Sequence, residues 1–526
     1  MKKPPAKNAA VAEPDHDAEL PEGWAQADLA SFSTLITKGT TPTSLGFEYQ
    51  PKGISFVRVE NLTDGRIERS TITTFINKEA DEALKRSRLQ MGDLLFSIAG
   101  TIGRTALVIV DDLPANTNQA LAIIRGTEPV LIPRLLQLAL MSSVTQQQAQ
   151  SDARGGSMNN ISLEDVRTMR LTIPPRAEQG RIIPRLEELL RTLNQAEQRL
   201  AKVPKILKAF RQSVLAAACS GRLTEDWREG INNLPSTHAL LQDVLSQRRQ
   251  MWDAECMAAG RNRKYVNPIV FDQNSDLPAI PETWIWTSAD SLCSQITDGE
   301  HIQPPYRETG LPMLTAKHVR DGYVVFDDAG LVSDADFKKC LQRCAPTKDD
   351  ILIVSVGATT GRAAIVEKCP PFAIVRSVLL LRPLIEPRYF LGWIHSPWCF
   401  NWMQSASGAS AQPHLYINDT RRMPFPLPTL QEQHEIVRRV EALFKLADTI
   451  EERVKTATKR ADKLTQSILA KAFRGELVPT EAELARKEGR DYEPASVLLE
   501  RIRAEREKSA TSTNGTKPRR ATAGKK

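Results

Sequence analysis

Apolar residues recur with great regularity in residues 178–223, where the spacing between them alternates between four and three. From Ile182 to Ala217, all eleven positions at this spacing are apolar. An average repeat of 3.5 residues is typical of helices that pair in a coiled coil. The pattern therefore predicts one long helix with an apolar seam made of Ile182, Leu186, Leu189, Leu193, Ala196, Leu200, Val203, Leu207, Phe210, Val214 and Ala217.

The same seam returns 254 residues later, within residues 432–477. The two copies align over their full length without an insertion. Ten of its eleven positions are apolar: Ile436, Val440, Leu443, Ala447, Ile450, Val454, Ala457, Ala461, Leu464, Ile468 and, as the exception, Lys471. Each seam covers 35 residue steps, which is roughly 53 Å at ~1.5 Å per residue. Since an isolated helix of this kind is unstable in water, each must bury its stripe, most simply against the other.

Two prolines interrupt the first helix. Pro184 lies near its start, where proline is tolerated, whereas Pro204 is central and costs an interior helix about 3 kcal/mol. We expect a kink or a short break just before Pro204. The second copy carries Thr458 at this position and should be straighter.

The duplication extends beyond the helices. Pro-Glu-Gly-Trp at 21–24 returns as Pro-Glu-Thr-Trp at 281–284, and an apolar strand with a glycine turn at 92–104 returns at 349–362. The chain is therefore predicted to be a tandem duplication of about 255 residues. Its expected fold class is α/β (α+β): two mixed α/β globules separated by an antiparallel two-helix coiled coil with pseudo-two-fold symmetry.

The predicted organisation follows the chain in order. It comprises a disordered tail at 1–19, a globular domain at 20–176, a first spacer helix at 177–223, a linker with a short helix at 224–279, a second globular domain at 280–430, a second spacer helix at 431–477, a C-terminal helix at 478–508 and a basic disordered tail at 509–526.

Composition narrows the possible functions. No apolar run approaches the ~18 residues of a membrane span, and residues 1–17 are polar, so we expect a cytoplasmic protein without a secretory signal. Seven cysteines form no Cys-x-x-Cys pair, which favours free thiols over a zinc site. The net charge of +7 permits nucleic-acid binding but does not establish it.

Enzyme signatures are missing. The stretch Cys369-Pro370-Pro371-Phe372 differs by one residue from the Asn/Asp-Pro-Pro-aromatic signature of amino methyltransferases, and the residue that differs is the polar one. No Walker A loop or His-Glu-x-x-His motif occurs, and the glycine sites are interpreted as tight turns. We therefore expect no catalytic site, no metal and no cofactor in this chain.

Two interpretations of the function remain open. Two inverted globules joined by a rod of fixed length suit two DNA half-sites separated by a fixed gap. The alternative is a non-catalytic coiled-coil scaffold with two protein-binding heads.

The chain resembles the specificity (S) subunit of type I restriction-modification systems over nearly its full length. The resemblance lies in the order, repeated twice, of Pro-Glu-Gly-Trp at 21–24, Gly-Asp-x-Leu to Gly-Thr-Ile-Gly-Arg at 92–104, Ala-Glu-Gln at 177–179, and the helix ends at 211–223 and 466–477. It implies that the two globules are target-recognition domains that read an asymmetric bipartite sequence of double-stranded DNA. This subunit would provide the sequence specificity and would not catalyse a reaction.

The resemblance also implies partners. Two modification subunits would use S-adenosylmethionine to methylate adenine, and restriction subunits would use ATP and magnesium to translocate and cleave DNA. The implied positions for helix pairing and for docking of modification subunits are Ile182, Leu186, Leu189, Leu193, Leu200, Ile436, Val440, Leu443, Ile450 and Val454.

Candidate DNA contacts come from three places in the duplication. The loops before the two spacer helices carry Arg154, Asn159 and Asn160, and Gln412 and His414; arginine suits guanine and amides suit adenine, although an ordinary capped loop is an equal alternative. Lys317 and His318 replace Glu60 and Asn61, and so are candidate specificity differences. Arg104 and Arg362 recur and could hold phosphates or pair with a carboxylate. Arg167 and Arg421 also recur, and capping or pairing within the fold is as good an interpretation of them as DNA binding.

Overall fold

The protein was analysed as a computed structural model. It describes residues 19–151, 160–258, 260, 264–269, 277–367, 370–408 and 413–514, with the side chains of 507 and 509–514 excepted. The predicted N-terminal tail up to residue 18, the segment 515–526, Cys369, Arg154, Asn159 and Gln412 lie outside the described residues. The chain divides into two units: unit 1 is Met1–Leu200 with Thr456–Lys526, and unit 2 is Ala201–Lys455.

Unit 1 contains a four-stranded antiparallel sheet in the order β2 (Leu35–Lys38), β10 (Leu121–Arg125), β7 (Leu94–Ser97) and β8 (Thr105–Leu107). Beside it in unit 1 are a mixed sheet, β6 (Phe75–Ile76), β3 (Ile54–Val57) and β9 (Ala115–Thr117), and the pairs β1 (Ala25–Asp28) with β11 (Arg170–Ile173) and β4 (Leu62–Thr63) with β5 (Arg66–Ile67). The α-helices of this globule are α1 (Leu29–Phe32), α2 (Lys78–Ala83), α3 (Pro133–Leu140), α4 (Ser143–Ser151) and α5 (Leu163–Arg167).

Unit 2 repeats this topology in its described residues, except that no pair of named strands corresponds to β4 and β5. Its four-stranded antiparallel sheet has the order β13 (Cys293–Asp298), β19 (Val378–Pro383), β16 (Ile351–Val354) and β17 (Ala363–Ile365). The mixed sheet is β15 (Gly330–Val332), β14 (Leu311–Leu314) and β18 (Ala373–Ile374), and β12 (Ile285–Ser288) pairs with β20 (Pro424–Leu427). Besides its spacer segments, the α-helices of unit 2 are α8 (Glu225–Glu229), α9 (Thr237–Ala258), α10 (Ala289–Leu292), α11 (Asp334–Arg343), α12 (Pro387–Ile394), α13 (Pro397–Ala406) and α14 (Ile417–Arg422).

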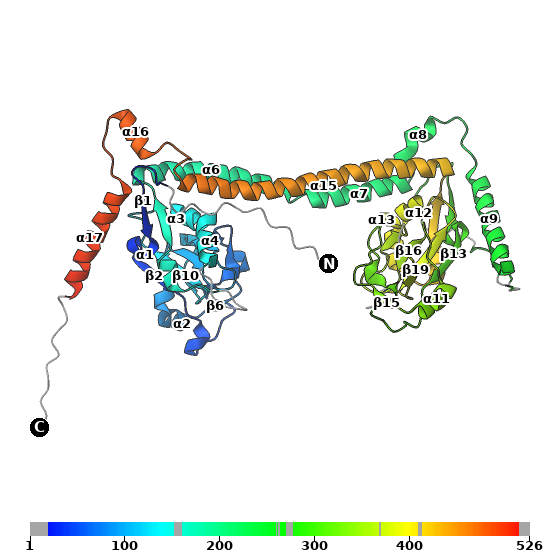
Figure 1. The fold of residues 1–526 in the computed structure, drawn as a ribbon, viewed down its shortest axis with the longest axis horizontal. Coiled ribbons are helices and arrows are strands. Elements are labelled where there is room, and N and C mark those ends of the chain that lie inside the picture. Colours follow the sequence, from blue (N-terminus) through cyan, green and yellow to red (C-terminus); the bar gives the residue numbers. More distant parts are fainter. Residues whose placement is uncertain are drawn as a thin grey trace, which may run out of the picture. The chain divides into compact units, whose positions relative to one another are not determined.

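The long helices follow the hydrophobic pattern (Figure 1). The first spacer is broken into α6 (Arg176–Leu200) and α7 (Val203–Cys219), so the predicted break just before Pro204 is confirmed. Pro204 is the second residue of α7, where its missing N–H is harmless. The second spacer is one unbroken helix, α15 (Leu430–Phe473), as its Thr458 predicted.

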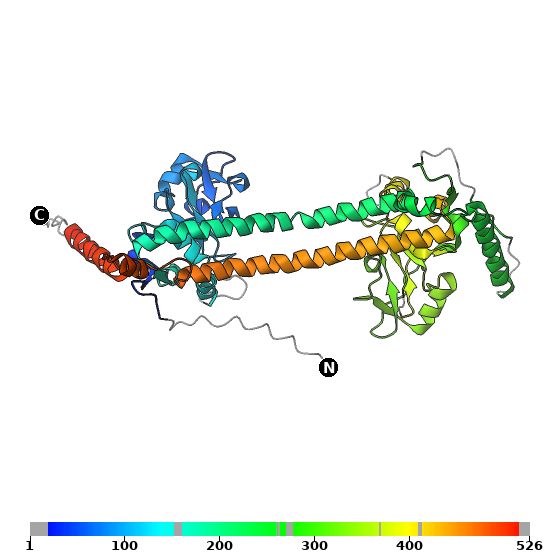
Figure 2. The ribbon, with the colours of Figure 1, turned by 90° about the horizontal axis from the view of Figure 1, so that it is seen from above.

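Within each unit, a segment of the first spacer lies antiparallel to a segment of α15 (Figure 2). In unit 1, Ile182 and Leu186 share a buried cluster with Leu469 and Ala472. In unit 2, Arg211 Nη2 lies 2.6 Å from Asp448 and 3.0 Å from Glu451. The predicted fold class is confirmed: both units share one mixed α/β topology, and spacer segments pair within each.

Several boundaries differ from prediction, and the largest differences lie in the C-terminal part of the chain. The helix α15 ends at Phe473, because Gly475 adopts a φ of 76° that terminates the helix. The single helix expected at 478–508 is two helices, α16 (Glu481–Glu488) and α17 (Ala495–Asn514). The expected disordered tail at 509–526 is therefore wrong for residues 509–514, which continue α17.

The seam also drifts near the end of α15. Leu464 is 50% exposed, whereas Leu469 and Ala472 are buried. A straight α-helix has 3.6 residues per turn, so a strict 3.5 repeat leaves the interface by about 20° in each heptad. The prediction that Leu464 belongs to the buried seam is therefore wrong.

Candidate nucleic-acid interface

The structure joins two segments that the sequence singled out separately. In unit 1, Ala99 in the glycine turn forms a β-bridge with Asn160, and the Ile161 N–H donates to the Ile98 carbonyl at 3.0 Å. In unit 2, Val356 bridges His414, and the Gly357 N–H donates to the Pro413 carbonyl at 3.1 Å. We call this feature the turn–loop edge: residues 98–104 with 160–162 in unit 1, and 355–362 with 413–416 in unit 2.

A glutamine on a neighbouring helix holds each glycine turn. The Gln146 Nε2 of α4 donates to the Gly103 carbonyl at 3.0 Å, and the Gln404 Nε2 of α13 donates to the Thr360 carbonyl at 2.9 Å. Gly103 has a φ of 90°, and a Cβ there would lie 2.0 Å from Gln146 Oε1. These are tight turns of the fold, as predicted, and they fix the edge in both units.

The recurring arginines follow the turns directly. Arg104 is exposed, and its Nη1 lies 3.2 Å from the Leu62 carbonyl and 3.4 Å from the Val59 carbonyl. Arg362 Nε lies 3.7 Å from an Asp321 carboxylate oxygen. An arginine carries five N–H donors, so these contacts leave donors for an anion in both units.

The exposed side chains at the edge differ between units. Unit 1 presents Asn160, which is exposed. Unit 2 presents the half-buried His414, whose ring centroid lies 4.0 Å from that of Tyr416, and Tyr416 is 58% exposed. Tyr416 was missed by sequence reasoning because its counterpart in the other copy is Ser162, a helix cap; the only signal was an aromatic residue directly after a candidate loop.

His318 is removed from the candidate contacts because it is only 1% exposed. Its Nδ1 accepts a hydrogen bond from the Thr315 N–H at 2.8 Å, just as Asn61 Oδ1 accepts one from the Arg58 N–H at 2.8 Å. Both residues cap a short 3₁₀ turn, and burial lowers the pKa of His318, which favours the neutral ring. The neighbouring Lys317 is exposed and pairs with Asp328 at 2.7 Å.

Arg167 and Arg421 make contacts within the fold. Arg167 pairs with Glu164 at 3.2 Å and donates to the Ile36 carbonyl at 3.3 Å. Arg421 Nε lies 3.6 Å from an oxygen of the nearly buried Asp290. Of the two possibilities that the sequence left open, pairing within the fold describes both residues.

The repeated sequence motifs have a structural role. The Trp24 Nε1 donates to the buried Glu178 at 3.1 Å, and the Trp284 Nε1 donates to the buried Glu432 at 2.8 Å. Each glutamate lies in the first turn of a spacer helix, so these bonds tie the start of each globule to its spacer. Gln179 does the same for α3, because its Oε1 accepts the Ile132 N–H at 3.0 Å.

Glu178 gives the first spacer a testable dependence on pH. Burial raises its pKa, and the carboxylate of Glu481 adds to the effect, while hydrogen bonds oppose it. An acid with a raised folded pKa binds its proton more tightly when folded, so its contribution to stability falls as the pH rises from about 4.

The change Glu178→Gln keeps an acceptor for Trp24 and removes the charge. We expect the free energy of unfolding of the variant, relative to wild type, to rise between pH 4 and pH 8 in urea titrations. A difference that is constant or falls over this range would contradict the expectation.

Across the described part of the chain, no group of three or more His, Cys, Asp or Glu residues could hold a metal ion. Among the same residues, no helix is both long and apolar enough to cross a membrane. The buried Asp93 and Asp350 are instead each paired with an arginine, Arg125 at 2.6 Å and Arg382 at 2.7 Å.

Comparison with known proteins gives a consistent picture. Residues 21–205 and 310–460 match the family model described as the type I restriction modification DNA specificity domain. The chain is 29% identical over 503 residues to the type I restriction enzyme EcoBI specificity subunit of Escherichia coli, covering 92% of this chain and 93% of that one. It is 27% identical over 508 residues to the EcoKI specificity subunit of Escherichia coli strain K12, covering 93% and 96%.

Solved structures share the fold. A chain from a study of complex assembly and conformational transition of a type I R-M system matches with a TM-score of 0.61 and 20% identity, over 87% of this chain and 99% of that one. The HsdS subunit from Thermoanaerobacter tengcongensis matches with a TM-score of 0.50 and 20% identity, over 88% and 99%.

Proposed function

Since the chain belongs to the type I restriction modification DNA specificity family, we propose that it is the subunit that selects the DNA sequence for such a complex. Each globular domain reads one half of a bipartite site in double-stranded DNA. The observation that carries this proposal is the turn–loop edge, which is built twice with the same backbone bridges and different exposed side chains. Equal scaffolds with unequal side chains suit two unequal half-sites.

The roles at the edge divide by chemistry. Arg104 and Arg362 occupy equivalent places in the two units and suit phosphate, which every sequence offers. Asn160 in unit 1 and His414 with Tyr416 in unit 2 differ in their donors and acceptors and suit base edges. Lys317 adds an exposed cation in unit 2.

Catalysis and cofactors belong to the partners in this proposal. Two modification subunits bind S-adenosylmethionine and methylate adenine, and restriction subunits use ATP and magnesium to translocate and cleave DNA in the cytoplasm. Support for docking on the spacers comes from the seam: Ile182, Leu186 and Ile436 are buried, while Leu189, Leu193, Leu200, Val440, Leu443, Ile450 and Val454 keep part of their surface exposed.

The experiment that tests the proposal is DNA binding by the chain assembled with its modification subunits. We expect two separated footprints and an affinity that falls about 10³-fold between 50 and 200 mM salt. Binding to proteins alone, insensitive to salt and without a footprint, would instead favour the two-headed scaffold.

An exchange of side chains between units tests the roles of Asn160, His414 and Tyr416. The double change His414→Asn and Tyr416→Ser gives unit 2 the side chains of unit 1. We expect it to weaken binding to the native site by about 5-fold to 150-fold, the cost of one lost base contact, and to relax only one half of the methylated sequence. The control is Asn160→His, which should relax only the other half; a change in both halves by either variant would contradict the assignment.

A further inference from the structure

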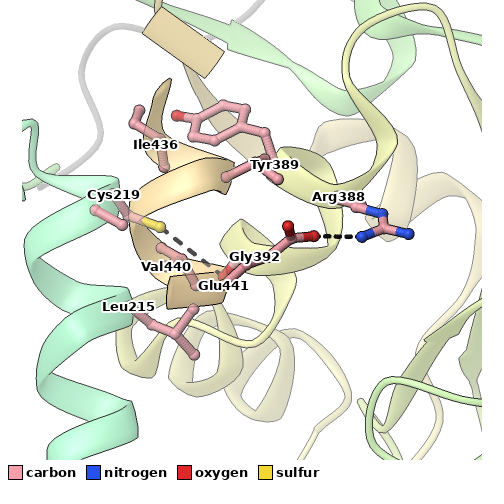
Figure 3. Close-up of a pocket in the computed structure, with 10 residues that line it drawn as sticks. Leu215, Cys219, Arg388, Tyr389, Gly392, Ile436, Val440 and Glu441 are labelled. Carbon is pink, nitrogen blue, oxygen red and sulfur yellow. Dashed lines mark hydrogen bonds and ion pairs between the residues drawn. The ribbon is translucent and has the colours of Figure 1, made fainter. Parts of the chain in front are cut away.

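A small apolar pocket lies in unit 2 where three helices meet (Figure 3). Leu215 and Cys219 of α7, Gly392 of α12, and Ile436 and Val440 of α15 line it, and its volume is about 60 Å³. Arg388 and Glu441 form an ion pair at its border. The pocket is therefore an apolar hollow beside a charged pair.

The equivalent place in unit 1 is filled by the chain itself. At the repeat distance of 254 residues, Gly392 corresponds to Leu138 and Cys219 to Phe473. Leu138 is 1% exposed, and Phe473 packs against the same cluster. The border is unchanged, because Arg134 and Glu187 form the corresponding ion pair at 3.0 Å. The two units thus share the helices and the ion pair around this place. They differ in the side chains that fill it.

The pocket has room at the glycine. A Cβ added to Gly392 would meet Leu215 Cδ2 at 3.9 Å, which is ordinary van der Waals contact. Burial raises the pKa of the Cys219 thiol to about 12, so this wall is uncharged at neutral pH. Gly392 itself is partly exposed, as are Val437 and Val440, so the hollow can be reached from the surface.

The small size of Gly392 and Cys219 lowers the stability of unit 2 at this place. Glycine destabilises a helix relative to larger residues, and an unfilled apolar hollow loses packing contacts. Unit 1 demonstrates that the same frame accepts a leucine and a phenylalanine. An occupant from outside the chain would recover these contacts in unit 2.

We propose that this pocket receives an aliphatic side chain, such as a leucine, from a helix of the modification subunit that docks on unit 2. The inference rests on the proposed function. The class of occupant follows from Leu138, which fills the corresponding place in unit 1. An apolar side chain that fills a pocket bordered by polar groups is the usual form of a hot spot in a protein–protein interface.

The test fills the pocket in the full-length chain with Gly392→Leu, and separately with Gly392→Ala. Thermal unfolding and affinity for the purified modification subunit are measured for each. We expect both variants to raise the unfolding temperature, while the affinity falls at least tenfold for Gly392→Leu and about threefold for Gly392→Ala. The control is Gly180→Ala in α6, where a Cβ meets nothing within 4 Å; it should raise stability and leave the affinity unchanged.

The outcomes separate the possibilities. Filled variants that are more stable and bind as tightly as wild type would overturn the proposal and make the pocket a packing gap. If Gly392→Leu does not fold, Gly392→Ala decides, since its methyl group fits beside Leu215. A wild-type chain that does not bind the modification subunit at all would instead overturn the proposed function.

Discussion

Replacing Glu432 with alanine is expected to lower the free energy of unfolding of unit 2 by about 3–5 kcal/mol, the cost of breaking a buried ion pair from one side. Glu432 is fully buried and accepts hydrogen bonds from Trp284 Nε1 and Thr224 Oγ1, each at 2.8 Å, and from the Arg228 guanidinium. The Arg228 side chain is only 13% exposed. Alanine would therefore leave a nearly buried cation and a buried indole N–H without their partner.

The matched control is Glu178→Ala in unit 1. Glu178 accepts from Trp24 Nε1 and from the Glu481 N–H at 2.9 Å, and within the described residues no arginine donates a hydrogen bond to it. We expect this change to cost about 1–3 kcal/mol, the penalty for unsatisfied neutral donors. Urea unfolding of both variants measures the difference, and a larger cost for Glu178→Ala would contradict the account of Arg228.

Lengthening both spacer helices by one heptad is expected to lengthen the gap between the DNA half-sites. Seven residues add about 10 Å of helix, which corresponds to about three base pairs at about 3.4 Å each. The insertions belong beside Arg211 in α7 and beside Asp448 and Glu451 in α15, because these residues pair across the two helices. A whole heptad keeps the seam in register.

The gap is measured by methylation of a set of DNA sites whose half-sites are separated by different numbers of base pairs. We expect the preferred gap to grow by about three base pairs, with at least a tenfold loss on the original site. Inserting the heptad in α7 alone is the control, since it leaves one helix unpaired and should reduce stability without producing a new preferred gap. An unchanged gap in the doubly lengthened chain would rule out a spacer that sets the distance.

The sequence predicted the features that depend on local periodicity. The seams and the break before Pro204 follow from side-chain spacing and from the properties of proline. Duplication strengthened each prediction, because every element could be compared with its copy. Two apolar seam positions, Ala196 and Leu464, are exposed. Near the end of α15, at Leu464, the cause is the mismatch between 3.5 and 3.6 residues per turn.

The candidate site was predicted only in part, because it is assembled from distant segments. The bridges from Ala99 to Asn160 and from Val356 to His414 join loops about 60 residues apart, and no local pattern signals such pairing. His318 looked like a specificity difference, but it replaces Asn61 as a cap. Its role depends on a ring nitrogen substituting for an amide oxygen, which residue type alone does not reveal.

This chain provides the DNA sequence specificity of a methylating complex, and we infer that it does so through two half-site readers. The most direct measurement is sequencing of methylated adenines in DNA from cells that carry this chain with its modification subunit. We expect one motif of two short, different half-sites separated by a gap of constant length and undefined sequence. A continuous motif, or methylation that does not depend on this chain, would contradict it.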